Sequence, residues 1–278
     1  MTGVQTCALA IWVNELPLWL AIAVKAIFAA TVVVGAVTMA ERSGPLVAGL
    51  IIAMPISIGP AYVMLGLTAT PQFIADSALR SVAANAAVAV FGVVYVLLAR
   101  RLPMSVSLLL ALVSWFAIAA LELAWNPGAW TVVTVSTLGL LAGSRLMRPA
   151  ASARKSLAGA KRWYDLPLRA VFVGVFVAIL VTVSNAIGPQ WTGLLAAFPL
   201  VLTSSIILLH PRVGATATAA VLATAIEGIV IYPLALLVVH RYSVAWGTWW
   251  SLGAGLAAIL AWTLLVFAVR KSRAAKPG

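Results

Sequence analysis

The sequence has a single cysteine, Cys7, among its 278 residues. One thiol forms neither an internal disulfide nor a multi-thiolate metal site. The motifs His-Glu-x2-His, Cys-x2-Cys and Gly-Lys-Ser/Thr are missing, and the two histidines, His210 and His240, lie near the ends of apolar segments. These absences argue against a metal enzyme or an ATPase, so we expect no metal site, no cofactor and no enzymatic activity.

Charged residues are also scarce. They make up 9% of the chain, whereas 64% is hydrophobic and the mean hydropathy is +1.11. A soluble domain needs more charged surface than this, so the composition predicts a polytopic membrane protein. A bilayer-spanning helix takes about 20 apolar residues. We therefore predict an all-α transmembrane bundle of about nine spans with short loops.

Acidic residues are the rarer charge, with 6 Asp and Glu against 18 Lys and Arg and a net charge of +12. A basic chain can bind nucleic acid, but here the basic residues lie beside apolar spans, where they fix topology and meet anionic headgroups. Residues expected on the cytoplasmic side are Arg42, Arg100, Arg101, Arg145, Arg148, Arg154, Lys155, Lys161, Arg162, Arg169, Arg212, Arg270, Lys271, Arg273 and Lys276. We expect a lipid bilayer as partner, no nucleic acid, and a cytoplasmic C-terminus.

The first residues are unlike the rest. Residues 2–11, TGVQTCALAI, resemble a translated sequencing adapter. We therefore treat residues 1–12 as an artefact and leave them out of fold reasoning. The natural start of the protein is expected to be missing.

Apolar length and the Gly and Pro breakers define nine spans. They cover residues 18–40, 44–67, 73–98, 104–125, 128–147, 166–187, 189–209, 213–239 and 244–269. Aromatic residues expected at the outer ends of spans, as in an interfacial belt, are Trp19, Trp125, Trp130, Trp191, Tyr242, Trp246, Trp249 and Trp250. The belt and the basic loops agree on one orientation, in which Arg241 lies in an outer loop.

The pattern Gly-Pro-x3-Gly-Leu-x4-Pro occurs twice, each time in a long apolar segment. The copies are Gly44, Pro45, Gly49, Leu50 and Pro55, and Gly188, Pro189, Gly193, Leu194 and Pro199. The first Pro of each copy suits the first turn of a helix, whereas the second falls near mid-membrane and removes a helical hydrogen bond there. Two interrupted helices in matching halves are typical of the binding site of a secondary transporter.

The halves around these copies form a predicted repeat. Leu16-Pro17-Leu18 opens the first unit and Leu166-Pro167-Leu168 the second, so spans 1–4 match spans 6–9. Each span lies five spans before its equivalent in the second unit, and an odd number gives the two units opposite orientations in the membrane. The repeat is therefore inverted. Span 5 is either a linker or the first helix of a five-helix unit whose partner was lost, which would make the natural protein 5+5. The predicted units are residues 13–125, 126–165 (linking helix and basic loop), 166–270 and 271–278 (tail).

Segments 48–62, AGLIIAMPISIGPAY, and 192–206, TGLLAAFPLVLTSSI, carry a resemblance. They are similar to the AGL-x4-P helix of the small bacterial inner-membrane proteins of the GlpM type, which are about half this length. The resemblance covers mainly this one helix in each half. It implies a duplicated small unit in a bacterial inner membrane, and it carries over no catalytic residue.

Glu227 is the most deeply placed charged residue, in the apolar setting of span 8. An ionisable group at this depth suits proton uptake and release, and the alternative is a hydrogen-bonded carboxyl that closes a helix contact. Its counterpart in the first half is near Asn85, which is also polar and mid-span. Polar groups at equivalent depths favour a cavity on the repeat axis.

The two Pro breaks carry small polar neighbours. These substrate-site candidates are Pro55, Ser57, Gly59 and Asn85 in the first half, and Pro199, Thr203, Ser204 and Ser205 in the second. Exposed N–H groups after a break suit an anion, which favours anionic or zwitterionic solutes. In the alternative, the hydroxyls only satisfy the carbonyls that the kink frees.

Other charges lie nearer to the span ends. Asp76 and Arg80, one turn apart, are a self-neutralising pair, an outer gate, or a site where Arg80 clamps a substrate carboxylate. Lys25 and Glu122 either pair, if spans 1 and 4 touch, or snorkel to the interface. We assign Arg169, at the inner end of span 6, to topology.

The leading functional hypothesis is a secondary transporter or permease for a small solute, coupled to protons through Glu227. The alternative is a scaffold or accessory subunit that transports nothing. A third class, a lipid-acting membrane enzyme, is disfavoured because Asp76, Glu122 and Glu227 lie at different depths and form no acid–base pair.

Overall fold

A computed structural model describes residues 17–42, 58–125, 127–152 and 164–274. These ranges contain helices and no strand, which confirms the all-α prediction. The helices are α2 (Leu18–Arg42), α4 (Ile58–Thr68), α5 (Pro71–Leu98), α6 (Met104–Trp125), α7 (Ala129–Leu146), α8 (Arg148–Ser152), α9 (Asp165–Ala196), α10 (Leu200–Gly228), α11 (Tyr232–Trp246) and α12 (Thr248–Ala274). A 3-10 turn, η1 (Ile229–Ile231), joins α10 to α11.

Several of these helices are long and apolar enough to cross a membrane. Among the described residues there are 5 such stretches, namely Pro71–Leu98, Met104–Trp125, Asp165–Ala196, Leu200–Trp246 and Thr248–Leu265. Shorter apolar stretches cover Trp19–Gly35 and Ile58–Thr68. The protein is therefore a multi-pass membrane protein, as its composition predicts. The tryptophans expected at the membrane interface are all exposed, namely Trp19, Trp125, Trp130, Trp191, Trp246, Trp249 and Trp250.

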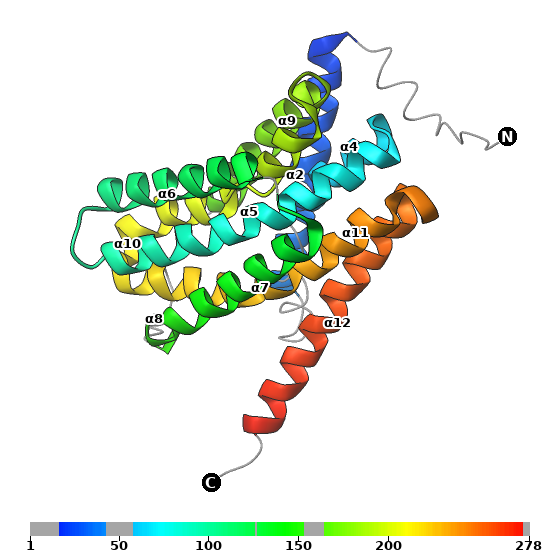
Figure 1. Ribbon diagram of the computed structural model, residues 1–278. Coiled ribbons are helices and arrows are strands. Elements are labelled where there is room, and N and C mark those ends of the chain that lie inside the picture. Colours follow the sequence, from blue (N-terminus) through cyan, green and yellow to red (C-terminus); the bar gives the residue numbers. More distant parts are fainter. Residues whose placement is uncertain (1–16, 43–57, 126, 153–163, 275–278) are drawn as a thin grey trace, which may run out of the picture.

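Helix α5 is the centre of the bundle. It packs against α6, α7, α9 and α11, which surround it in Figure 1. It begins at Pro71, in the first turn where no N–H is missed, and the preceding Thr70 is its N-cap, whose hydroxyl accepts from the Phe73 N–H at 3.2 Å. Its alanine-rich middle, residues 83–89, is buried, so neighbouring helices approach closely on several sides.

Three single glycines divide the second half into helical hairpins. Gly188, Gly214 and Gly247 have φ of 74°, 79° and 86°. Their ψ angles are 172°, 175° and 156°. This combination with positive φ costs residues with a Cβ far more than glycine, so glycine allows the chain to turn in one residue. After Gly247, α12 folds back on α11, where Ser243 and Ser251 share a hydrogen bond of 2.8 Å.

The contacts with α5 show the chain direction on either side of Gly214. Residues 189–213 run parallel to α5, because Gly193 lies beside Ser77 and His210 hydrogen-bonds to Tyr95. After Gly214 the chain runs antiparallel to α5. There Ile226 lies beside Gly92 and His240 Nδ1 donates to the Ala75 carbonyl at 2.8 Å.

The predicted break at Pro199 is present. Helix α9 ends at Ala196, Pro199 has ψ of 50°, and α10 starts at Leu200. The interruption follows from the missing N–H of Pro199. Pro55, the end of the first copy of the pattern, and Ser57, two residues later, lie outside the described residues.

Most predicted span ends agree with the helices to within a few residues, but one outer loop does not. The prediction ends span 8 at residue 239, whereas α11 continues to Trp246. Arg241 therefore lies in a helix and not in a loop. Within this helix Ser243 Oγ donates to the Val239 carbonyl at 2.7 Å, so its hydroxyl has a partner without a loop. The chain instead turns at Gly247, where φ is positive.

Helix α12 lies at the edge of the bundle. Gly255 packs closely on α11, with Ala235 and Val239 as its neighbours. The C-terminal part of α12 extends away from the other helices in Figure 1. Helix α8, a short element in the predicted linker, packs against α10.

Candidate functional site

A row of polar side chains follows one face of α5. Ser77, Ser81 and Asn85 are spaced by one helical turn and are 0%, 0% and 3% exposed. Asn85 Nδ2 donates to the Ser81 carbonyl at 2.7 Å. The row therefore lies in the interior of the bundle, and Asn85 is buried at mid-helix as the sequence predicts.

Ser81 joins three segments of the chain. Its hydroxyl donates to the Gly193 carbonyl at 2.6 Å and accepts from Tyr62 of α4, 2.8 Å away. Gly193 belongs to the second copy of the Gly-Pro pattern. The polar row of α5 thus meets the interrupted helix just before its break. Gly59, another predicted site residue, lies in the first turn of α4, partly buried.

The hydroxyls after Pro199 bond mainly to their own helix. Ser204 and Ser205 both donate to the Val201 carbonyl, at 3.0 and 2.6 Å. The Thr203 hydroxyl is buried and hydrogen-bonds to none of the described residues. These serines satisfy backbone near the break, as the non-binding alternative expects.

Arg169 adds a cation to this region. On sequence grounds it serves topology, but in the structure its Nη2 donates to Ser205 Oγ at 3.0 Å. A visible sequence signal was its spacing, because Arg169 follows Asp165 by one turn at the start of an apolar helix. Spacing alone does not tell whether such an arginine turns outward to lipid headgroups or inward.

An ion pair ties the start of α9 to the residues just before Gly214. Arg212 Nη1 donates to Asp165 Oδ2 at 2.7 Å, and the Arg212 guanidinium lies 5.1 Å from the ring centre of Tyr164. His210, two residues before Arg212, hydrogen-bonds to Tyr95 of α5. Segment 205–212 is therefore held to α9 and α5 by polar contacts.

Glu227 lies elsewhere. It is at the end of α10, next to η1, and its side chain is exposed, although the sequence places it in an apolar interior. Its neighbour Ile226 contacts Gly92, two turns along α5 from Asn85. The structure therefore does not bring Glu227 and Asn85 together.

The charges predicted near the outer span ends form a different set of contacts. Glu122 has Arg80 of α5 as its electrostatic partner, and no described ion pair joins it to Lys25. Lys25 is 7% exposed in α2, which packs mainly on α9. Asp76 Oδ1 accepts from Gln72 Nε2 at 3.0 Å.

A small cavity of about 20 Å³ adjoins Glu122, between α5, α6 and α7. Its lining includes Ala83, Trp125 and Ser136. Glu122 Oε2 is buried and has no hydrogen-bond partner among the described residues. The cavity is large enough for a single water molecule, and too small for a solute.

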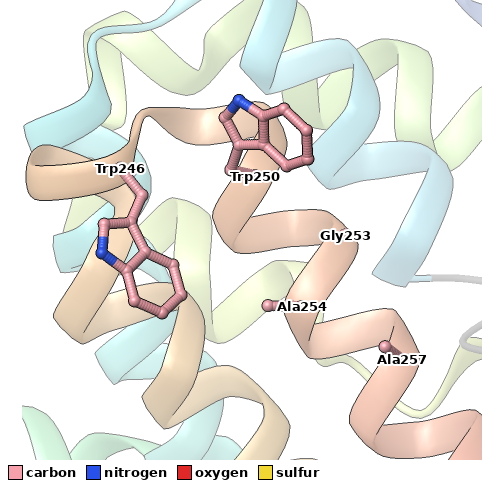
Figure 2. A pocket seen from close by; sticks show the side chains of 5 residues that line it. All are labelled: Trp246, Trp250, Gly253, Ala254 and Ala257. Atoms are coloured by element: carbon pink, nitrogen blue, oxygen red, sulfur yellow. The ribbon is translucent and has the colours of Figure 1, made fainter.

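A larger groove lies on the surface of α12. Figure 2 shows Trp246 and Trp250 beside the small residues Gly253, Ala254 and Ala257 that form its floor. The lining is apolar and open, which suits a lipid chain and offers no group to orient a polar solute. We therefore place the candidate site at the Pro199 break, next to the polar row of α5.

Within the described ranges, no three His, Cys, Asp or Glu side chains lie close enough to hold a metal ion. Comparison of the chain with protein-family models, curated proteins and solved structures gives no match.

Proposed function

We propose that the protein is a secondary transporter or permease for a small anionic or zwitterionic solute. The observation that carries this proposal is the helix break at Pro199, inside an apolar stretch and beside buried Ser81 and Asn85. Broken helices with polar neighbours at mid-membrane are typical of transporter binding sites.

In the proposed architecture, nine spans form an inverted repeat built from a duplicated GlpM-like unit. Spans 1–4 correspond to spans 6–9, and the Pro55 break supplies the second half of the site. The pairing of α5 with the antiparallel 215–246 segment supports this, because α5 and that segment are spans 3 and 8. We place the protein in a bacterial inner membrane with a cytoplasmic C-terminus.

In the proposed mechanism, the two halves rock about the site and expose it to each side in turn. Glu227 takes up and releases the coupled proton. Its place beside η1 supports this role, because a 3-10 turn within a long helix often marks a hinge. Motion there would change the surroundings of Glu227 during the cycle.

A scaffold that transports nothing is the second candidate. It is favoured by the hydrogen bonds inside the polar cluster, since Tyr62, Ser81 and Asn85 bond to protein groups. Side chains satisfied in this way fix packing without any ligand.

Reconstituted liposomes separate the two candidates. The measurement is the internal pH while pools of small acids and amino acids are added outside, for wild type, Glu227→Gln and Glu122→Gln. A transporter gives a solute-dependent pH change that Glu227→Gln abolishes while solute exchange persists. Folded protein that moves neither protons nor labelled solute contradicts the proposal and favours the scaffold. Persistence of the pH change in Glu227→Gln and its loss in Glu122→Gln would move the proton site to Glu122.

A further inference from the structure

Arg169 is a cation inside the bundle whose donors are only partly used. Nη2 donates to Ser205 Oγ at 3.0 Å, and Ser205 passes its own hydrogen to the Val201 carbonyl at 2.6 Å. Nε is buried and bonds to none of the described residues. A guanidinium presents five donors in a rigid fork, so a buried Nε–H without an acceptor is a costly arrangement that a ligand oxygen would relieve.

Arg169 shares a carboxylate with a second arginine. Asp165, one turn earlier in α9, is its electrostatic partner. The same carboxylate holds Arg212 at 2.7 Å. One carboxylate thus serves two guanidinium groups, and the oxyanion of a ligand would offer Arg169 an acceptor of its own.

Arg169 also contacts the helix that is interrupted at Pro199. Ser205 is 4% exposed and belongs to the segment that follows the Pro199 break. The guanidinium is therefore held by a residue of the interrupted helix, within the bundle.

We propose that Arg169, held in place by Ser205, binds an oxyanion, which is a carboxylate or phosphate group of the solute. The Nε and Nη donors of arginine match two oxygens of such a group, and Ser205 holds the guanidinium in place. This inference rests on the proposed transport function and names the group that is recognised. The same chemistry is present in anionic lipid headgroups, but Arg169 Nε and Ser205 are buried between helices and not on the lipid-facing surface, which favours a solute that enters the bundle.

Thermal unfolding tests the site without knowledge of the natural solute. The protein is placed in nanodiscs of phosphatidylcholine, and tryptophan fluorescence is followed with potassium acetate, succinate or phosphate. Potassium chloride at equal ionic strength is the control. At least one oxyanion should raise Tm in a saturable manner, beyond the effect of chloride.

Variants assign the effect to Arg169. Arg169→Gln should abolish the shift, and Arg169→Lys, which keeps the charge and favours folding, should weaken the apparent Kd about tenfold to a hundredfold. Arg145→Gln is the matched control, because Arg145 is an exposed arginine on α7. It should leave the apparent Kd unchanged.

Three results would overturn the proposal. One is that no oxyanion gives a saturable shift, and another is an equal shift in wild type and Arg169→Lys. The third is stabilisation by nanodiscs of phosphatidylglycerol alone, lost in Arg169→Gln, which would assign the site to a lipid headgroup. The liposome measurement separates failure of this site from failure of the transport function. Liposomes that move only a neutral solute refute the anion site. Oxyanion binding without any solute flux refutes the transporter.

Discussion

Gly193 lies directly against the carbonyl oxygen of Ser77, where the interrupted helix crosses α5. A Cβ at position 193 would overlap that oxygen and lie 2.8 Å from Cβ of Arg80. The same contact brings the Gly193 carbonyl within 2.6 Å of Ser81 Oγ. The glycine of the Gly-Leu-x4-Pro pattern thus serves helix packing, and its lack of a side chain makes the buried hydrogen bond possible.

Gly193→Ala should destabilise the protein by about 3 kcal/mol or more, because backbone atoms have to move apart. The matched control is Gly139→Ala on α7, where a Cβ would meet only Ala86 at 3.9 Å. That change should be neutral or stabilising by about 0.5–1 kcal/mol. Denaturation in detergent, followed by tryptophan fluorescence, measures both. Equal stability of the two variants would contradict the close crossing.

Ser81→Ala should cost about 1–3 kcal/mol, because the Tyr62 hydroxyl and the Gly193 carbonyl both lose a buried partner. Ser144→Ala is the control, since Ser144 bonds only to the Leu141 carbonyl of its own helix at 2.9 Å. It should change the free energy of unfolding by less than about 0.5 kcal/mol. If the double change Ser81→Ala, Tyr62→Phe is strictly additive, the hydroxyl pair is not coupled and this account is wrong.

Gly214→Ala should cost about 1–3 kcal/mol, because φ of 79° and ψ of 175° strain any residue with a Cβ. The space around a Cβ at this position is open, so the cost comes from the backbone alone. Gly228→Ala, in equally open space but with φ of −66°, is the control and should be neutral or slightly stabilising. Equilibrium unfolding of the two variants should differ accordingly, and a tolerated Gly214→Ala would contradict the single-residue turn.

Asp165→Asn should weaken the contact between α9 and the Gly214 turn and cost about 1.5–3 kcal/mol, as expected for a hydrogen bond to a charged group. A double-mutant cycle with Arg212→Gln isolates the coupling between the two residues. Asp76→Asn, whose partner is the neutral Gln72, should have a smaller effect. A coupling energy near zero would show that the 2.7 Å contact contributes nothing to stability.

Some features could be predicted from the sequence because they depend on local chemistry. Apolar length predicts α5 and α6 almost to the residue, since a span needs a fixed run of apolar side chains. Pro199 predicts the helix break because a proline at mid-span removes a helical hydrogen bond and its ring clashes with the preceding turn. Glycine at 188 and 214 permits a one-residue turn, but many glycines stay in helices, and the polar residues 240–243 resemble a loop although they are helical.

The candidate site depended on tertiary contacts. Asn85 could be placed at mid-helix, but nothing in the sequence indicates that the adjacent Ser81 row would meet Gly193, far along the chain. The residues next to Glu227 in the sequence are apolar, yet its side chain is exposed. A helix has two sides, and only packing decides which side is covered. The same reason applies to Arg169.

The sequence by itself therefore determined that this chain is a bundle of membrane helices with an interruption at Pro199, because hydropathy and the chemistry of proline act locally. The tertiary structure decided that Arg169 turns inward to Ser205 and that Gly193 touches α5. These are contacts between residues distant in the chain, and they depend on which helix faces meet when the bundle packs.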